Sequence, residues 1–445
     1  MIDLVLVEGD YEAIRSDLCS GETERCAILF ANQTLRDDGR VRLLVREIEW
    51  PETSDYSRKG RLEAQLTQDL VARITKRARR EKTSIIFVHS HPGSAAPHFS
   101  VVDREGEQHL RAFLAHRHPD LIHAALVVSA GGVRARQLGT SEEIRVVSIG
   151  SRREVLFDPL ATTDAEVAEQ FDRQVRAFGV KGQRTLEGLS VAIVGLGGTG
   201  SLAAQELVHL GVRDFILVDP DVVESSNLNR ISHAFSEDIG KPKTEIAARY
   251  IRQIAKMAQV KRIDEDVMEA KTARQLADAD ILFGCTDSHG SRAVMQQVAY
   301  QYLIPYIDMG VTLIASKGSI THVYGRAQLL APGHACFTCS SLLDSNEVRR
   351  DMMTSFEREA DPYIQGHREL APAVMSLNGT VSSLAVTMFL AVAVGVPIEA
   401  RHVLYNALTS SMRAVRATPQ ADCYVCSRRG AFARGDSWPI FARET

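Results

Sequence analysis

The glycine-rich turn near the middle of the chain limits the possible folds more than any other feature. An apolar run, Val191–Val194, leads into the sequence GLGGTG at 195–200, and a helical pattern follows over Ser201–Leu210. Strand-like runs at Phe215–Val218 and Ile281–Phe283 come later, with helical segments between them. Such alternation predicts a mostly parallel sheet with helices on both faces. We therefore expect this part of the chain to be a doubly wound α/β domain.

The spacing of the glycines fits more than one kind of nucleotide site. Gly195, Gly197 and Gly200 follow the pattern G-x-G-x-x-G, and glycines there let backbone N–H groups approach phosphates at the positive end of a helix. Asp219 lies about 20 residues further on, at the end of the next strand, where a carboxylate can hold a ribose. A nicotinamide-dependent enzyme is therefore one interpretation.

A cluster of charged residues after the turn favours a different chemistry. Arg230 stands in Asn227-Leu-Asn-Arg, Lys243 in Gly-Lys-Pro-Lys, and Asp287 follows Gly284-Cys-Thr directly after a strand. Hydride transfer needs no such cluster. Adenylation does, because cations stabilise charge on the α-phosphate and pyrophosphate and a carboxylate can hold Mg²⁺.

Together with Asp172-Arg173-Gln174 ahead of the first strand, this pattern resembles the ThiF/MoeB/ubiquitin-activating superfamily over about residues 165–430. The resemblance implies a Rossmann-like fold and the use of ATP and Mg²⁺ to convert the C-terminal carboxylate of a carrier protein into an acyl-adenylate. It also implies a homodimer in which Arg173 reaches the neighbouring subunit's ATP site, and a catalytic role for Asp287 with Mg²⁺. The residues implied to bind the nucleotide are Gly195, Gly197, Gly198, Gly200, Asp219, Asn227, Arg230, Lys243 and Asp287, and Arg292 also fits the family pattern.

A second constellation lies near the start of the chain. After the short apolar run 85–88 come His89-Ser-His91-Pro and, seven residues later, Ser100-Val-Val-Asp103. Histidines at i and i+2 of a strand share one face, and Ser100 is a plausible N-cap for a helix that carries Asp103. Two His, one Asp and an open fourth position suit a catalytic zinc, which also needs a base such as Glu24 for its bound water.

This spacing, with an upstream Glu before a Cys-Ala-Ile-Leu strand, resembles the JAB/MPN (JAMM) metalloprotease signature over about residues 1–145. The resemblance implies Zn²⁺ on His89, His91 and Asp103, with Glu24 as general acid and base. It implies that Ser100 helps to stabilise the tetrahedral intermediate, and that peptide or isopeptide bonds after ubiquitin-like C-termini are cleaved. Glu22 is two residues from Glu24 and is expected to face the same side, so it remains an alternative base.

The seven cysteines point to metal binding rather than to a disulfide scaffold. Cys336 and Cys339 form one C-x-x-C pair and Cys423 and Cys426 a second, which predicts a closed structural Zn²⁺ site; a redox dithiol is the alternative. Many relatives transfer the activated carrier to a cysteine in the crossover segment after the first pair, but Ser340–Pro372 contains none. We therefore expect adenylation without a thioester step.

The organisation of the 445 residues follows from these motifs. We expect an α+β JAB/MPN domain over 1–150, a linker over 151–164 and the ThiF-type domain over 165–445. Within the first domain, 24–31 and 41–49 look like strands, Leu62, Leu66, Leu70 and Ile74 predict an amphipathic helix, and 121–129 and 133–138 a hairpin. In the second domain, a helix is expected at 165–178.

Charge and hydropathy exclude some partners. The net charge of −4 gives no reason to expect a nucleic acid or a membrane surface as partner. The longest apolar run, Leu384–Val396, is shorter than the roughly 20 residues a membrane span requires, so a core helix is expected there. The N-terminus has no signal-peptide pattern, and we expect a cytoplasmic protein.

The leading hypothesis is therefore an enzyme of a bacterial-type ubiquitin-like conjugation system. Its carrier has a glycine-rich C-terminus that one half adenylates and the other half exposes or releases, with a separate conjugating enzyme as a possible partner. Activation of a sulfur carrier for cofactor biosynthesis, with trimming of its precursor, is an alternative. A regulatory binding module with inactive sites is another.

Overall fold

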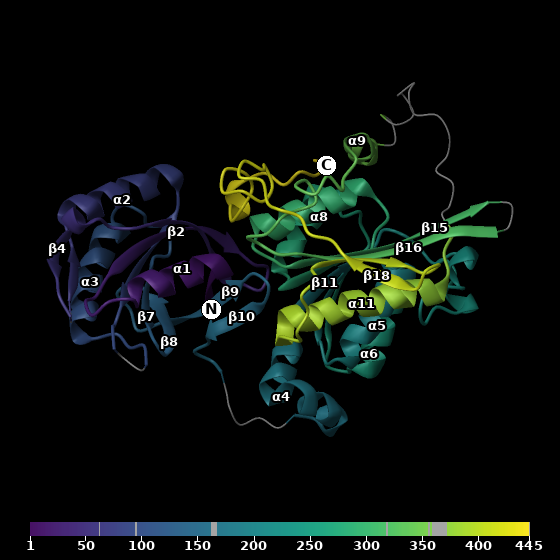
Figure 1. Cartoon of the computed structure of the whole chain (residues 1–445), viewed down its shortest axis with the longest axis horizontal. Helices are drawn as coiled ribbons and strands as arrows, with labels where there is room; N and C mark the ends of the chain where they lie inside the picture. Colours follow the sequence, from purple (N-terminus) through teal and green to yellow (C-terminus); the bar gives the residue numbers. More distant parts are fainter. Residues whose placement is uncertain are drawn as a thin grey trace. The chain divides into compact units, whose positions relative to one another are not determined.

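The structure is a computed structural model that describes residues 1–61, 63–93, 96–161, 167–316, 319–354, 357 and 372–444. The chain forms two compact units (Figure 1). The first comprises Met1–Asp164 with Gln301–Leu303 and Arg428–Pro439, and the second comprises Ala165–Tyr300, Ile304–Ser427 and Ile440–Thr445. Both units contain helices and strands, which is the mixed α/β character expected from the sequence.

The first unit is built on a mixed eight-stranded sheet in the order β1-β3-β2-β6-β7-β8-β9-β10. β1 also pairs with β9, so the sheet closes on itself. The elements are β1 (Ile2–Val7), α1 (Glu8–Leu18), β2 (Cys26–Leu35), β3 (Val41–Glu49), β4 (Tyr56–Lys59), β5 (Ala64–Leu66), α2 (Gln68–Glu81), β6 (Ser84–Ser90), α3 (Val101–Ala115), β7 (Ala124–Ser129), β8 (Gly132–Gln137), β9 (Glu143–Ile149) and β10 (Arg153–Phe157).

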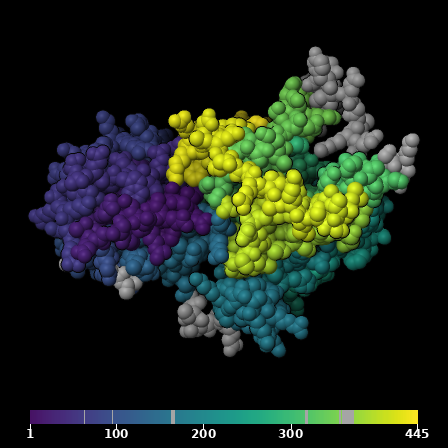
Figure 2. Space-filling model, in the orientation of Figure 1, coloured from purple at the N-terminus to yellow at the C-terminus, as the bar shows by residue number. Residues whose placement is uncertain are grey.

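The helices of this unit cover the two faces of the sheet. Ile14 and Leu18 of α1 pack into one core, whereas Leu70 and Ile74 of α2 pack with Leu114 of α3 into another. The other side of α1 forms part of the surface of the unit (purple in Figure 2). The side chains of β6 alternate between the two cores. His89 and His91 lie at the carboxyl end of this strand.

Two boundaries in this unit differ from those expected. The predicted amphipathic helix begins only at Gln68, because Thr67 caps it by accepting from the N–H of Leu70 and Leu66 ends strand β5 instead; Leu62 lies outside the described residues. The expected linker 151–164 begins with β10, which pairs with β9, so the polar residues before it form a turn within the sheet. Residues 162–166 lie outside the described residues.

The second unit has an eight-stranded sheet in the order β13-β12-β11-β14-β15-β16-β17-β18. The strands from β13 to β15 are parallel, and β16 to β18 continue the sheet in antiparallel fashion. The strands are β11 (Ser190–Val194), β12 (Asp214–Val218), β13 (Gln259–Ile263), β14 (Ile281–Gly284), β15 (Tyr306–Ser316), β16 (Ser319–Leu330), β17 (His402–Asn406) and β18 (Ser411–Ala414). The helices are α4 (Asp172–Glu187), α5 (Gly198–His209), α6 (Lys243–Ile254), α7 (Ala270–Gln275), α8 (His289–Gln301), α9 (Ser345–Met352) and α11 (Met375–Val394).

This arrangement confirms the doubly wound, Rossmann-like fold. Helices lie on both sides of the sheet, with α5, α6 and α11 on one side and α8 on the other (Figure 1). The strand order reverses between β11 and β14, and in such sheets ligands bind at the carboxyl ends of the strands on either side of this switch point. The helix expected at 165–178 starts at Asp172 and continues past a kink at Phe178–Gly179, where Gly179 has φ +75°.

α11 contains most of the apolar run that was expected to form a core helix. Among the described residues it is the one helix whose length and composition would allow it to cross a membrane, and 50% of its apolar window is buried. Val381, Phe389 and Val392 pack into the core of the second unit. The helix ends at Gly395, whose positive φ of 76° is the left-handed conformation that closes many helices.

Candidate active sites

The two histidines of the N-terminal motif lie side by side at the carboxyl end of β6. His89 pairs in register with Cys26 of β2, and the backbone N–H of His91 donates to the carbonyl of Val128 on β7 (2.9 Å). The imidazole centroids are 4.9 Å apart. Two neighbouring strands therefore hold both rings next to each other, as the i, i+2 spacing predicts.

Asp103 completes a cluster of three potential metal ligands. Its Oδ1 lies 3.4 Å from Nε2 of His89, and its Oδ2 lies 3.6 Å from Nε2 of His91. All three ligand atoms lie within 4.8 Å of one another, and Nε2 of His89 is buried without a hydrogen-bond partner among the described residues. A buried nitrogen of this kind fits a metal ion, and two His and one Asp are ligands that Zn²⁺ accepts.

Ser100 fixes the position of Asp103 through a capping box at the start of α3. Its hydroxyl accepts from the N–H of Asp103 (3.1 Å), and its own N–H donates to Oδ2 of Asp103 (2.6 Å). Burial acts to raise the pKa of Asp103, but the nearby imidazoles of His89 and His91 and the hydrogen bond from Ser100 outweigh it and hold the pKa well below its usual range. The carboxylate thus stays ionised, as a metal ligand must.

Glu24, rather than Glu22, faces the histidines. The Glu24 side chain is buried, and its Oε1 lies 3.7 Å from Nε2 of His91. Burial raises the pKa of Glu24, with His91 and His89 acting in the opposite direction. The Glu22 side chain is 84% exposed and lies 3.9 Å from Arg61, so the expectation that both glutamates face the same side is wrong.

The glycine turn of the second unit packs tightly between β11 and α5. Gly195 has φ +88°, and a Cβ on Gly200 would lie 1.8 Å from the carbonyl oxygen of Gly195. A Cβ on Gly197, in contrast, would meet no atom within 4 Å. Because the first N–H groups of a helix have no partner inside it, the turn offers donors to an anion next to this open space.

Asp219 connects the end of β12 to the glycine turn. Its Oδ2 accepts from the N–H of Leu196 (2.5 Å) and its Oδ1 from the N–H of Asp221 (2.9 Å). Nζ of Lys243 lies 3.8 Å from Oδ1 of Asp219 and 2.7 Å from Oδ2 of Asp221. Burial raises the pKa of Asp219, with Lys243 the main opposing influence. Each carboxylate oxygen keeps a second lone pair that can accept from a ribose hydroxyl.

Arg230 also lies near the glycine turn. A Cβ on Gly198 would be 3.4 Å from Cδ of Arg230, whose guanidinium donates to the carbonyl of Ser226 (2.6 Å). Asn227 is buried, and its Oδ1 accepts from the N–H of Glu224 (3.3 Å). Asn227 therefore orders the turn that carries Arg230.

Sequence reasoning missed Asn378, which lies at the same turn. It belongs to the first turns of α11 and is 5% exposed. A Cβ on Gly198 would lie 2.1 Å from its Nδ2, so the carboxamide and the glycine are in close contact. Asn378 is 180 residues from Gly198 in the sequence, and no local pattern links the two.

Asp287 and Arg292 follow β14 at the same edge of the sheet. Asp287 is exposed. Arg292 donates to Oδ1 of Asp308 (3.0 Å) and to the carbonyl of Thr286 (2.7 Å), and Arg326 binds the other oxygen of Asp308. Arg292 thus holds the loop that presents Asp287. Asp308 and Arg326 are two further residues that the sequence did not indicate.

Arg173 lies near the start of α4, where its side chain is exposed. It is separated in sequence from the other residues of the site and belongs to a surface helix. The predicted role across a subunit boundary is not tested by a single chain and remains a prediction.

The four cysteines of the two C-x-x-C pairs come together. The Sγ atoms are 3.8 Å apart for Cys336 and Cys339, 3.6 Å for Cys336 and Cys423, and 3.4 Å for Cys339 and Cys426. Hydrogen bonding from Cys426 lowers the pKa of Cys336 to about 5 against the effect of burial. Four thiol ligands at these distances fit one tetrahedral zinc with a structural role.

The other three cysteines lie in surroundings that favour the thiol form. Burial raises the pKa of Cys26 to about 12 and raises the pKa of Cys285 above its usual range. Burial also raises the pKa of Cys19. A thiolate is the reactive form of cysteine. The expected lack of a thioester step stays a prediction.

Comparison with known proteins gives matches to both parts. Residues 171–425 match the model of the ThiF family, and residues 11–139 match that of prokaryotic homologs of the JAB domain. The SAMP-activating enzyme E1 of Haloferax volcanii is 27% identical over 270 residues, which cover 59% of this chain and 91% of the relative.

Two other proteins are similar over much the same share of the chain. The molybdopterin-synthase adenylyltransferase of Escherichia coli K12 is 27% identical over 270 residues, 59% of this chain and all of the relative. The crystal structure of E. coli MccB with ATP covers 59% of this chain and 75% of its own, with 17% identity and a TM-score of 0.45.

Proposed function

Because the chain belongs to the ThiF family and joins that domain to a JAB domain, we propose that it adenylates the C-terminal carboxylate of a ubiquitin-like carrier protein and cleaves peptide or isopeptide bonds at that terminus. The carrier is expected to end in a glycine-rich tail that both sites can accept in extended form. The observation that carries the adenylation half is the convergence of the glycine turn, Asp219, Lys243 and Arg230 at the switch point of the sheet.

In the adenylation step, an oxygen of the carrier's carboxylate forms a bond to the α-phosphorus of ATP and pyrophosphate leaves. Asp219 accepts from the ribose, and the backbone of the glycine turn donates to the phosphates. Lys243, now paired with the exposed Asp221, would exchange this partner for a phosphate, and Arg230 adds a second cation. Asp287 would hold Mg²⁺, which neutralises phosphate charge when bound.

In the hydrolytic half, His89, His91 and Asp103 would hold Zn²⁺, which lowers the pKa of a bound water. Glu24 would take the proton from the attacking water and return it to the leaving amine, and its raised pKa suits both tasks. Ser100 would donate its hydroxyl hydrogen to the oxyanion, because its oxygen already accepts from the backbone of Asp103.

The proposal includes a cytoplasmic location, because that compartment supplies ATP and keeps thiols reduced.

The primary test is ATP–pyrophosphate exchange with candidate carriers. Exchange that depends on the carrier's C-terminal residues is expected. If no carrier supports exchange while the protein still binds ATP, the alternative of a regulatory binding module is favoured. A carrier thiocarboxylate, rather than isopeptide-linked adducts, would favour sulfur-carrier activation, for which the molybdopterin-synthase relative gives a reason. Isopeptide products would also point to a separate conjugating enzyme.

Asn378 provides a test of the nucleotide turn. Asn378→Ala is expected to lower the rate of pyrophosphate exchange about tenfold or more, because it removes a buried hydrogen-bond donor beside the phosphate-binding backbone. Thr380→Ala, two residues further along α11, is the matched control and should retain the wild-type rate, since its hydroxyl donates within the helix. Equal rates for the two variants would show that Asn378 only packs against Gly198.

The proposed homodimer gives a complementation test for Arg173. Arg173→Ala and Lys243→Ala should each abolish exchange, but co-expression should restore about a quarter of the wild-type rate, because half of the dimers are then mixed and each has one complete site. Arg176→Ala, one helical turn away and ion-paired to Asp172, should behave as wild type. A fully active monomer would contradict the shared site.

A further inference from the structure

The end of the chain belongs structurally to the JAB unit. Arg428–Pro439, called here the C-terminal segment, groups with residues 1–164 although about 260 residues of sequence separate them. Cys426, the last of the four clustered cysteines, precedes the segment by two residues. The segment therefore starts where a metal site ends.

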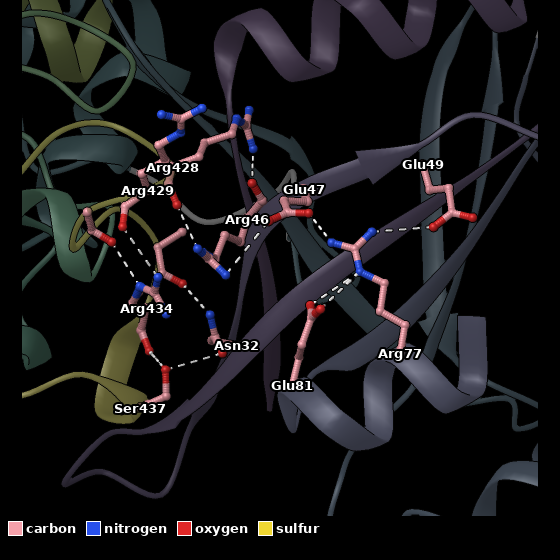
Figure 3. Close-up of polar contacts among 12 residues, drawn as sticks. Asn32, Arg46, Glu47, Glu49, Arg77, Glu81, Arg428, Arg429, Arg434 and Ser437 are labelled. Carbon is pink, nitrogen blue, oxygen red and sulfur yellow. Dashed lines mark hydrogen bonds and ion pairs between the residues drawn. The ribbon is translucent and has the colours of Figure 1, made fainter. Parts of the chain in front are cut away.

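The segment is held to strands β2 and β3 by buried polar contacts (Figure 3). Nδ2 of Asn32 donates to the carbonyl of Ala433 in a fully buried hydrogen bond of 2.8 Å. The hydroxyl of Thr34 donates to Oδ2 of Asp436 (2.6 Å). The two donors, Asn32 and Thr34, are buried side chains of β2 that would lose their partners if the segment left, and such losses are costly.

The start of the segment is fixed by Arg428. Arg46 donates to the carbonyl of Arg428 (2.6 Å), and the guanidinium of Arg428 donates to the carbonyl of Arg46 in return. Arg428 also pairs with Asp10 of α1, a carboxylate that is only 9% exposed (2.5 Å). Removal of Arg428 would leave this buried charge without its cation.

The remainder of the segment packs as a compact loop. Ala431, Phe432 and Ala433 are buried. Gly435 has φ +49°, and a Cβ there would lie 3.2 Å from Cδ1 of Leu44, so the backbone approaches β3 closely. The hydroxyl of Tyr302 donates to Asp436. The side-chain amide of Gln301 donates to the carbonyls of Gly435 and Trp438. The segment thus packs against β2 and β3 and shields this part of the sheet from solvent.

From these contacts we propose that metal bound by the four cysteines stabilises the JAB unit, with the C-terminal segment as the link. A metal that joins Cys423 and Cys426 to the other two cysteines fixes the residues just before Arg428. The segment then pays less conformational entropy to dock on β2 and β3. Without the metal, the residues before Arg428 gain freedom and docking becomes weaker.

Hydrogen exchange of the full-length protein, followed by mass spectrometry, tests the proposal directly. Cys426→Ser should lose one zinc per chain, and peptides from β2, β3 and the segment should exchange about tenfold faster or more. Cys19→Ser, which changes a cysteine of the JAB unit outside the cluster, should exchange as wild type. Loss of the zinc with unchanged exchange in β2 and β3 would overturn the proposal.

A second test measures the reverse effect, that of segment docking on zinc affinity. It remains decisive if Cys426→Ser does not fold. If the metal favours docking, loss of docking must weaken metal binding by the same factor. In a His89→Ala background, where only the cysteine site holds zinc, Arg428→Ala should lower zinc affinity in a chelator competition about tenfold relative to Arg429→Ala. Both variants lose one positive charge. Because the Arg429 side chain is exposed, Arg429→Ala leaves the contacts of Arg428 with Arg46 and Asp10 in place. Equal affinities would overturn the proposal, and neither readout depends on adenylation or cleavage.

Discussion

Replacement of Asp287 by alanine is expected to lower carrier-dependent ATP–pyrophosphate exchange about 10³-fold, equivalent to roughly 4 kcal/mol of transition-state stabilisation. Asp287 is an exposed carboxylate directly after β14, at the edge where the glycine turn, Asp219 and Lys243 converge. Without a carboxylate for Mg²⁺, the phosphate charge that builds up as pyrophosphate leaves would be poorly neutralised. The measurement is isotope exchange from labelled pyrophosphate into ATP at saturating carrier.

Two controls separate this effect from damage to the fold. Glu399→Ala removes an equal charge from another exposed position of the same unit and should keep the full exchange rate. The zinc content of Asp287→Ala should equal that of wild type, because the four cysteines lie elsewhere in the unit. An Asp287→Ala protein that exchanges within about threefold of wild type would remove Asp287 from the proposed mechanism.

The parts of the fold that sequence predicted are those with local signals. Strand β11, the glycine turn and α5 follow within about 20 residues, so periodicity and glycine placement suffice to locate them. The same holds for His89, His91 and Asp103, because a strand end and a capped helix start fix their positions. In both cases the functional residues lie in the same short stretch of sequence as the pattern that predicts the backbone.

The parts that sequence did not predict depend on packing between distant segments. Asn378 reaches Gly198 because α11 lies beside α5, and Arg326 reaches Asp308 because β16 pairs with β15. The C-terminal segment docks on β2 through the backbone carbonyl of Ala433 and the carboxylate of Asp436, contacts between distant segments that no local pattern reveals. Leu66 has the four-residue spacing of the helix that follows, but it ends β5. The helix starts after it because Thr67 is the N-cap residue.

Replacement of Glu24 by glutamine is expected to lower peptide or isopeptide cleavage about 10²- to 10⁴-fold with little loss of zinc. Glutamine keeps the size of the side chain and cannot take a proton from water. The zinc should remain because the ligand set is His89, His91 and Asp103, and the carboxylate of Asp103 is held independently by Ser100. The measurement is release of a carrier C-terminal extension, with zinc quantified in the same samples.

Glu22 offers a matched control for this experiment. Glu22→Gln makes the same chemical change two residues away, but its side chain is 84% exposed and lies near Arg61 rather than the histidines, so cleavage should remain at the wild-type rate. If both variants cleave normally, Glu24 is not the base. If Glu24→Gln loses activity and zinc together, its carboxylate would act as a metal ligand, since Oε1 is already 3.7 Å from Nε2 of His91. Retained zinc with lost cleavage is the result that assigns Glu24 to proton transfer.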